Sequence, residues 1–420
     1  MDSRLDPRVE TSTLSNGLAV TTVALPHLHT AVAGMFVKVG SRFESAEDNG
    51  LSHFVEHMMF RGTEKYPDSL ALNTAVERLG STLQAETGRH DSLFQLALEP
   101  DNLAAGIALL GELLTRPRFE QIELERALIL EEINADDIAR GLAFDGHPLG
   151  QRIIGPRDNV KRFTTADVRR HFAKFYGAKN CSLCVAGPVE HAAIVDAAAK
   201  SLANIPSGER AELVTAPPHV PGTKFRHVKD AGSQTSLSLV FRALSELDPN
   251  FLTLGALLRI LDDGMSTRLH YQIADQKGLA YSVSAGIEPL ADAALFEISS
   301  ATANAKVPAL VGELLSLLGG LRAGKITDDE LTKARVRYRY EALAAIDDAA
   351  SMASWFGGTR LYYQPPTISE RLTKMSNVTK EALVEVAEQV LVPDRLALAA
   401  VGTLSRARLG ELRSILDGWR

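Results

Sequence analysis

Residues 50–67 read GLSHFVEHMMFRGTEKYP, the most specific pattern in the chain. His53 and His57 are four residues apart, so a helix places both imidazoles on one face. Two imidazoles on one face can bind one metal ion, and Glu56 lies beside them, suited to accept a proton from a metal-bound water. The pattern H-x-x-E-H is one of the zinc-site patterns found on helices. A catalytic zinc needs three protein ligands and an open position, so the stretch predicts a third ligand from elsewhere.

The candidate segment for that third ligand is a second predicted helix, over residues 120–139, which is rich in glutamate. Glu125 and Glu132 are seven residues apart and therefore share one face of this helix. Two carboxylates at this spacing can supply one metal ligand and one group that orients another ligand. A glutamate-rich helix is also commonly a solvated face, and the spacing by itself leaves both interpretations open.

Segments of similar pattern recur about half a chain apart. Residues 164–189 and residues 379–404 both read as a helix, a turn, an apolar strand and a glycine. At nearly the same offset, residues 50–58 align with residues 264–272, although identity is low. Repeated order at a fixed offset indicates an internal duplication.

The duplication predicts two homologous domains of similar size. We expect an N-terminal metal-binding domain over 1–204 and a C-terminal domain without a metal site over 223–420. Residues 205–222 are rich in proline and polar residues and are the predicted linker. Helices and strands mix without strict alternation in each half, so the predicted fold class is α+β.

Composition excludes several classes of protein. The chain has 420 residues, of which 45% are hydrophobic and 23% charged, the balance of an ordinary globular protein. The net charge of −7 argues against a nucleic-acid binder, and two cysteines exclude a disulfide scaffold. No apolar run approaches the length of a membrane span and the N-terminus lacks an apolar signal segment, so we expect a cytoplasmic protein with no membrane partner.

Residues 50–67 resemble the active-site segment of the pitrilysin, insulinase and mitochondrial processing peptidase family of zinc peptidases. The resemblance continues in order along the chain, in ERALILEEI at residues 125–133, HPLGQRIIGP at 147–156, GMSTRL at 264–269 and KGLAYSV at 277–283. The length is similar to that of the short-chain bacterial and processing-peptidase branch. The resemblance therefore implies two homologous α/β-sandwich-type domains that together form half of a clam-shell dimer.

The resemblance also implies a role for each matched residue of the site. His53 and His57 match the zinc histidines, and Glu132 matches the third ligand, with Glu131 as the alternative register. Glu56 matches the general base, and Glu125 matches a helper carboxylate. The implied activity is that of a zinc endopeptidase with one Zn²⁺ per chain, which hydrolyses unfolded peptides or small proteins without a covalent intermediate.

Substrate-binding residues are implied at two further places. Gln84 and Ala85 match an edge strand that binds an extended peptide, although family members usually have asparagine where Gln84 stands. Tyr281 matches the tyrosine of an Arg–Tyr pair that binds substrate at the zinc site of the other half of the clam-shell. The matching arginine position is Ala274, which has no side-chain donor.

The missing arginine favours a heterodimer, in which a homologous partner subunit supplies the Arg–Tyr pair to the zinc site of this chain. Two alternatives remain open. In the first, the chain is a self-sufficient homodimeric peptidase in which Arg268 or another residue does the work of the arginine. In the second, it is a non-catalytic assembly subunit of the same fold.

Overall fold

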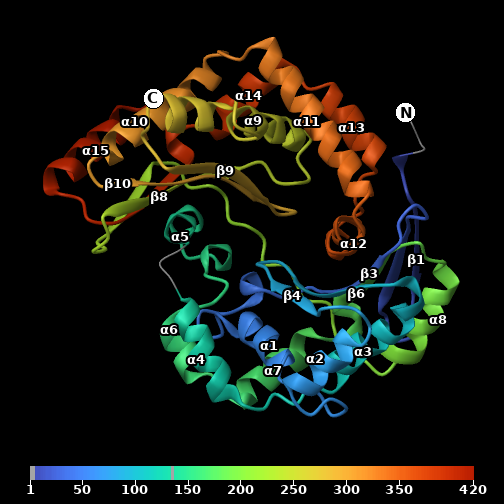
Figure 1. Ribbon diagram of the computed structural model, residues 1–420. Coiled ribbons are helices and arrows are strands. Elements are labelled where there is room, and N and C mark those ends of the chain that lie inside the picture. The colour runs from blue at the N-terminus through green and yellow to red at the C-terminus, as the bar shows by residue number, and fades with distance from the viewer. Residues whose placement is uncertain (1–4, 134–136) are drawn as a thin grey trace.

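The computed structural model of the protein describes residues 5–133 and 137–420. Two β-sheets face each other, and most helices cover their outer faces (Figure 1). The N-terminal sheet has six strands in the order β1-β2-β6-β3-β5-β4. Its strands are β1 (Arg8–Thr13), β2 (Ala19–Ala24), β3 (Ala31–Val37), β4 (Gln84–Thr87), β5 (Ser92–Leu98) and β6 (Cys181–Gly187).

The C-terminal sheet repeats this topology without the first strand. Its order is β7-β11-β8-β10-β9, which matches β2-β6-β3-β5-β4 strand for strand. Each sheet has one parallel pair, β2 with β6 and β7 with β11. The strands are β7 (Lys224–Val228), β8 (Gln234–Ala243), β9 (Ser282–Pro289), β10 (Ala294–Ala303) and β11 (Leu396–Val401). The matching order confirms the duplicated α+β fold.

Helices pack on the outer face of each sheet around two separate apolar cores. The first half contains α1 (Leu51–Met59), α2 (Ser69–Glu77), α3 (Leu103–Thr115), α4 (Ile122–Glu132), α5 (Ile138–Phe144), α6 (Arg157–Arg162), α7 (Thr165–Phe175) and α8 (His191–Leu202). The second half contains α9 (Phe251–Leu261), α10 (Val307–Arg322), α11 (Asp328–Ile346), α12 (Ala349–Gly357), α13 (Ile368–Ser376), α14 (Lys380–Val390) and α15 (Arg406–Gly418). Residues 205–222, the predicted linker, form neither helix nor strand.

Strand burial explains why the sequence forms these sheets. The central strands β3 and β6 are buried along their whole length, as expected for apolar strands covered on both faces. The outermost strand β1 instead alternates between exposed and half-buried residues. Side-chain caps explain where two of the helices begin. The side chain of Asp68 caps α2, and Thr164 forms a capping box with Asp167 at the start of α7.

The two halves exchange one helix each. Helix α5 follows α4 along the chain, yet it packs on the inner face of the C-terminal sheet, where Ala139 and Phe144 contact Val240 and Leu295. Helix α12 of the second half packs on the N-terminal sheet in the same way. Figure 1 shows both helices between the two sheets. The exchange buries apolar surface between the halves and fixes one against the other.

A buried ion pair also joins the halves. The guanidinium of Arg42, which is fully buried, donates to both carboxylate oxygens of Asp292 in the β9–β10 turn, at 2.7 and 2.5 Å. It also donates to the carbonyl of Val214 in the predicted linker at 3.0 Å from Nε. One side chain therefore connects both halves and the segment between them.

The prediction of one continuous helix over residues 120–139 is wrong, because the structure has two shorter helices there. Helix α4 ends at Glu132, where Ile133 turns to an extended conformation with ψ of 114°, and α5 begins separately at Ile138. Residues 134–136 lie outside the described part of the chain. The break lets α4 stay with the N-terminal core while α5 crosses to the other sheet. The helical pattern of the sequence continues across the break. It therefore cannot show that the segments before and after the break pack on different cores.

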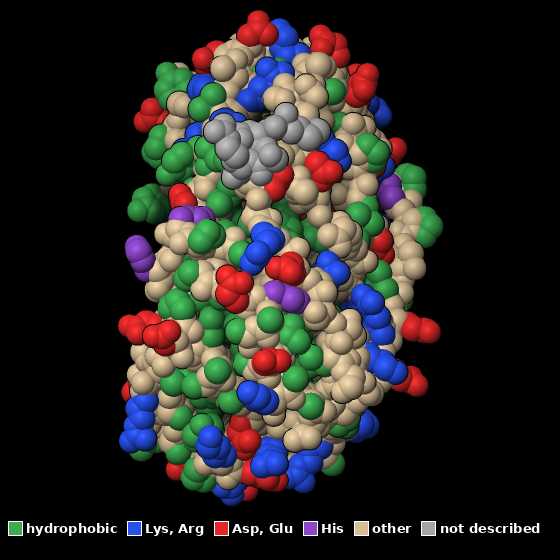
Figure 2. Space-filling model, turned by 90° about the vertical axis from the view of Figure 1, so that its right-hand side faces the viewer, with side chains coloured by type: hydrophobic (Ala, Val, Ile, Leu, Met, Phe, Trp, Pro, Cys, Tyr) green, Lys and Arg blue, Asp and Glu red, His purple; other side chains and the backbone are tan. Residues whose placement is uncertain are grey.

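In the described part of the chain, no helix has both the length and the apolar character of a membrane span. The face shown in Figure 2 has acidic and basic side chains interspersed, without a large field of one sign.

Candidate metal centre and peptide-binding pocket

Helix α1 presents the H-x-x-E-H residues on one side and the core on the other. It begins after Gly50, which has a left-handed φ of 106°. Leu51, Phe54 and Met58 are fully buried in the N-terminal core. His53, Glu56 and His57 therefore lie on the opposite, partly exposed side, where His53 and Glu56 border strand β4 and residues 152–154.

A buried carboxylate caps the start of this helix. Glu44, which is 3% exposed, accepts hydrogen bonds from the backbone N–H of Gly50 at 2.8 Å and of Ser52 at 2.6 Å. It also accepts one from the side chain of Asn49 at 3.0 Å. Unpaired N–H groups at a helix start need such acceptors, and a negative charge there is favourable. No capping pattern in the sequence marks Glu44, because such patterns place the acceptor less than six residues before the helix.

Replacing Glu44 with glutamine should destabilise α1. One buried oxygen becomes an NH₂ group that faces backbone donors, so we expect the free energy of unfolding to fall by about 2 kcal/mol. We also expect weaker zinc binding, because His53 follows directly after the capped turn. Urea denaturation and a zinc titration measure both effects. Glu47→Gln, at an exposed neighbouring position, is the matched control; equal stability of the two variants would contradict the capping role.

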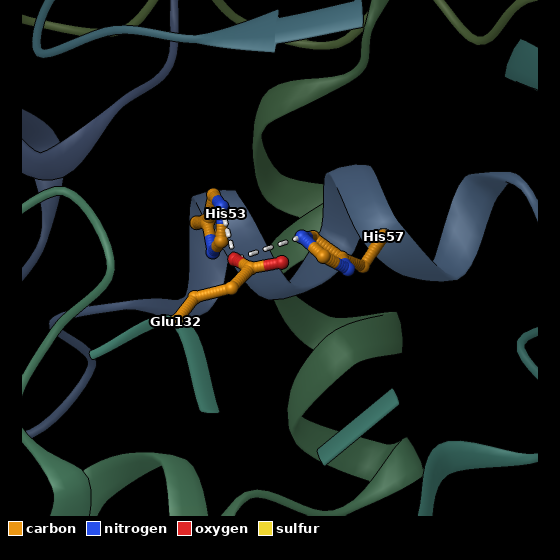
Figure 3. A group of neighbouring side chains, drawn as sticks. All are labelled: His53, His57 and Glu132. Atoms are coloured by element: carbon orange, nitrogen blue, oxygen red, sulfur yellow. Dashed lines mark ion pairs between the residues drawn. The ribbon is translucent and has the colours of Figure 1, made fainter. Parts of the chain in front are cut away.

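The three predicted ligands come together in the structure. Oε2 of Glu132 lies 3.8 Å from Nε2 of His53 and 3.6 Å from Nε2 of His57 (Figure 3). Each of the three residues offers an atom within 4.8 Å of the other two. Two ligands of a tetrahedral zinc lie about 3.4 Å apart, because each is about 2.0–2.1 Å from the metal. Two imidazoles and one carboxylate at these separations fit a zinc ion, whereas the adjacent Glu131 is exposed and outside the group.

Glu125 orients one of the histidines. Its buried carboxylate accepts a hydrogen bond from Nδ1 of His57 at 2.9 Å and is paired on its other side with Arg61. This fixes the proton of His57 on Nδ1 and leaves Nε2 free as a ligand. Burial would raise the pKa of Glu125, but the hydrogen bonds from His57 and Arg61 hold it lower than usual. The helper role implied for Glu125 therefore takes the form of an orienting contact to His57.

Protonation of the two histidines differs. Burial is the main cause, and the charge of His57 the second cause, that lowers the pKa of His53 to about 4. Its imidazole is therefore neutral at pH 7. Burial also acts to lower the pKa of His57, but the hydrogen bond to Glu125 and the charges of nearby carboxylates raise it overall. A metal ion must therefore displace a proton from His57 more often than from His53.

Glu56 lies in the same pocket without joining the ligand group. A pocket of about 420 Å³ is lined by His53, Glu56 and Glu132, together with residues of β4 and residues 152–154. Burial raises the pKa of Glu56, while a hydrogen bond to Thr87 opposes this shift. A carboxylate with raised pKa accepts a proton more readily than an ordinary one.

Strand β4 brings part of the predicted peptide-binding segment to the pocket. It is the edge of the N-terminal sheet and pairs only with β5, so one of its sides is free of strands. Ala85 lines the pocket. The side chain of Gln84 does not line it and is hydrogen-bonded to Gln95 at 2.9 Å.

Tyr281 is not brought to the pocket of its own chain. Its side chain is 96% exposed, and it does not line the pocket. Ala274 lies in a π-helix over Leu269–Gln276 and packs against the C-terminal core. The guanidinium of Arg268 is already bound, because its Nε donates a hydrogen bond to Oε1 of Glu330 at 2.7 Å. Arg268 therefore does not supply a free guanidinium in place of Ala274.

A buried histidine on α7, His171, contacts the helix that carries the site. Nε2 of His171 on α7 lies 3.0 Å from the hydroxyl of Ser52 on α1. Burial, helped by the charges of Lys174 and Arg170, lowers the pKa of His171 to about 3. The unfolded chain, with a histidine pKa of about 6.5, binds this proton more readily than the folded chain.

Stability should therefore fall as the pH drops below about 6.5, and continue to fall towards the folded pKa. For His171 the expected loss between pH 7 and pH 5 is about 2 kcal/mol of unfolding free energy. Urea denaturation at both values, with wild type and His171→Gln, measures it. The variant should lose less stability than wild type over this interval, whereas His29→Gln at an exposed position should behave as wild type; an unchanged slope for His171→Gln would refute the assignment.

Both halves of the chain match models of one protein family. Residues 19–145 match the family described as Insulinase (Peptidase family M16), and residues 162–338 match the Peptidase M16 inactive domain. A zinc protease of Rickettsia felis, itself uncharacterized, is 29% identical over 395 residues, covering 90% of this chain and 94% of the relative.

Two further relatives span nearly the whole chain. The mitochondrial-processing peptidase subunit beta of Saccharomyces cerevisiae is 26% identical, covering 95% of this chain and 92% of that protein. The crystal structure of a protease from Helicobacter pylori has a TM-score of 0.86 at 22% identity, covering 95% of this chain and 100% of that one. Because both halves match in order, with the fold and the H-x-x-E-H helix in place, the chain belongs to the insulinase family of peptidases, M16.

Proposed function

We propose that this protein is a zinc endopeptidase that hydrolyses unfolded peptides or small proteins. The observation that carries the proposal is the convergence of His53, His57 and Glu132. Two of these residues, His53 and Glu132, line one pocket together with Glu56. These three side chains would hold one zinc ion per chain. A zinc ion there supplies a Lewis acid for the peptide carbonyl and lowers the pKa of a bound water towards ~7.

The residues of the chain have separate tasks in this reaction. Glu56 accepts a proton from the water whose oxygen attacks the peptide carbonyl carbon. It then returns this proton to the amine nitrogen as the carbon–nitrogen bond breaks, so that water is consumed and no covalent enzyme intermediate forms. Glu125 keeps Nδ1 of His57 protonated throughout.

The free edge of β4 binds the peptide as an added strand. An extended peptide can pair with exposed backbone groups of an edge strand regardless of its side chains. Ala85 and its neighbours place such a peptide beside Glu56, because they line the same pocket. Gln84 contributes backbone contacts, and its side-chain carbonyl oxygen already accepts a hydrogen bond from Nε2 of Gln95.

We further propose a heterodimer, in which a homologous partner subunit supplies the arginine that Ala274 replaces. The packed position of Ala274 and the pairing of Arg268 with Glu330 support this arrangement. The exposed Tyr281 is available for contact with another subunit. A self-sufficient homodimer and a non-catalytic assembly subunit are the alternatives.

Activity measurements separate these possibilities. The zinc-loaded chain is assayed on an unfolded fluorogenic peptide, alone and mixed with a homologous chain that has arginine and tyrosine at positions equivalent to 274 and 281. Hydrolysis only in the mixture supports the heterodimer, and full hydrolysis by the chain alone refutes it. No hydrolysis in either case, with zinc bound, would refute the peptidase proposal.

A further inference from the structure

One cationic side chain lines the candidate peptide pocket and lies in a segment to which no function has yet been given. Besides His53, the charged residues that line this pocket are four carboxylates and Arg152. The carboxylates are Glu56, Glu86, Glu132 and Asp137. Carboxylates accept hydrogen bonds but cannot donate them when ionised, so they cannot bind the carbonyl oxygens of a peptide. Arg152 is the lining side chain that can donate several.

Other arginines near the pocket are already paired. Arg61 is bound to Glu125, and Arg89 donates to Asp137 at 2.6 Å. Arg140 is paired with Glu288 on strand β9. Within residues 5–133 and 137–420, the guanidinium of Arg152 makes no hydrogen bond or ion pair, and only its backbone carbonyl is engaged. A partly buried guanidinium with no protein partner, in a pocket suited to a peptide, is free to bind a ligand.

The backbone of Arg152 is fixed to the helix that carries the candidate ligands. Its carbonyl accepts a hydrogen bond from the side chain of Asn49 at 2.7 Å, directly before α1. Gly50 and Gly155 pack so closely that a Cβ on Gly155 would lie 2.7 Å from the Cα of Gly50, and both have a left-handed φ. Asn159 adds a hydrogen bond to the carbonyl of Asn49 at 3.0 Å. These contacts therefore fix the position of the Arg152 backbone relative to the helix that carries His53 and Glu56.

We propose that Arg152 is a substrate-binding residue, whose guanidinium donates hydrogen bonds to oxygen atoms of the peptide that lies at the metal centre of the same chain. The proposal rests on the proposed peptidase function and adds to it a cationic donor that this chain provides itself. A guanidinium presents its N–H groups in a planar fork, which suits carbonyl and carboxylate oxygens. Main-chain carbonyls and acidic side chains share this chemistry, and the experiment below separates them.

A binding measurement tests the proposal without catalysis. Fluorescence anisotropy of a labelled, unfolded peptide is recorded with the zinc-loaded Glu56→Gln chain and with the zinc-loaded Glu56→Gln/Arg152→Gln chain. We expect Kd to rise at least 10-fold when Arg152 is lost, because charged hydrogen bonds from the guanidinium to the peptide are then missing. Arg78→Gln, which removes an exposed arginine at the end of α2 that does not line the pocket, is the matched control and should leave Kd unchanged.

The peptide sequence identifies the atoms that are bound. Equal weakening for peptides with and without Asp or Glu assigns Arg152 to main-chain carbonyls, and weakening only for acidic peptides assigns it to side-chain carboxylates. An unchanged Kd for both peptides overturns the proposal. Arg152→Lys, which keeps the charge but loses the fork, provides a second variant should glutamine impair folding; it should give an intermediate Kd.

Steady-state kinetics of the active chain, or of the active mixture, provide a second readout. Arg152→Gln should raise KM while the zinc content stays at the wild-type value. Wild-type hydrolysis together with unchanged KM and Kd in the variant refutes the role of Arg152 but not the peptidase. Absent hydrolysis together with Arg152-dependent peptide binding refutes the peptidase but not the binding role.

Discussion

Glu56→Gln is expected to lower the rate of peptide hydrolysis by about 10²–10⁴-fold, the contribution of a positioned general base. Glutamine keeps the size of the side chain but cannot accept the proton of the attacking water. Zinc content should stay at the wild-type value, because the ligand atoms that converge belong to His53, His57 and Glu132. The assay combines peptide hydrolysis with metal analysis of the same sample.

The matched control is Glu131→Gln, which removes an exposed carboxylate next to Glu132. It should hydrolyse peptide and bind zinc as wild type does. Wild-type turnover by Glu56→Gln would remove Glu56 from the mechanism. Loss of zinc in Glu131→Gln would instead move the third ligand to the alternative register.

Arg42→Met should cause the largest loss of stability among the changes considered. Methionine fills much of the space but removes the guanidinium donors to the carboxylate of Asp292 and the carbonyl of Val214. Asp292 retains the hydrogen bond from the backbone N–H of Ala216. Breaking a buried ion pair from one side typically costs about 3–5 kcal/mol, and the side chain of Asp292 retains some exposure, so we expect about 3 kcal/mol. The free energy of unfolding from urea denaturation measures the effect.

Arg8→Met is the matched control, because Arg8 pairs with Glu190 at 3.5 Å on the exposed surface. Pairs of that kind contribute under about 1 kcal/mol. If Arg42→Met costs no more than Arg8→Met, the buried pair does not hold the halves together. The activity of Arg42→Met should also fall at temperatures where wild type is folded, because the space between the sheets depends on this connection.

The metal-ligand candidates could be predicted because their spacing is local. Four residues between His53 and His57 place both on one face of any α-helix, whatever the rest of the fold does. Glu132 followed from the family resemblance, and α4 brings it to the two histidines. The duplicated order of strands was likewise present in the sequence as segments that recur at a fixed offset.

Other features depend on contacts between distant segments and gave no local signal. The exchange of α5 and α12 cannot be read from a helical pattern, since that pattern shows which face is apolar but not which sheet covers it. Glu44 caps α1 from outside the usual capping positions. Arg152 becomes notable only once Arg61 and Arg89 are known to be paired, whereas its own guanidinium has no partner among the residues that the structure describes.

A crystal structure of the zinc-loaded chain, with anomalous diffraction recorded at the zinc edge, would show directly where the metal binds. We predict one zinc peak per chain, bound by Nε2 of His53, Nε2 of His57 and the carboxylate of Glu132, and no peak in crystals of Glu132→Ala prepared in the same way. A zinc-loaded chain without a peak at this position, or a peak that persists there at full height in Glu132→Ala, would contradict this prediction.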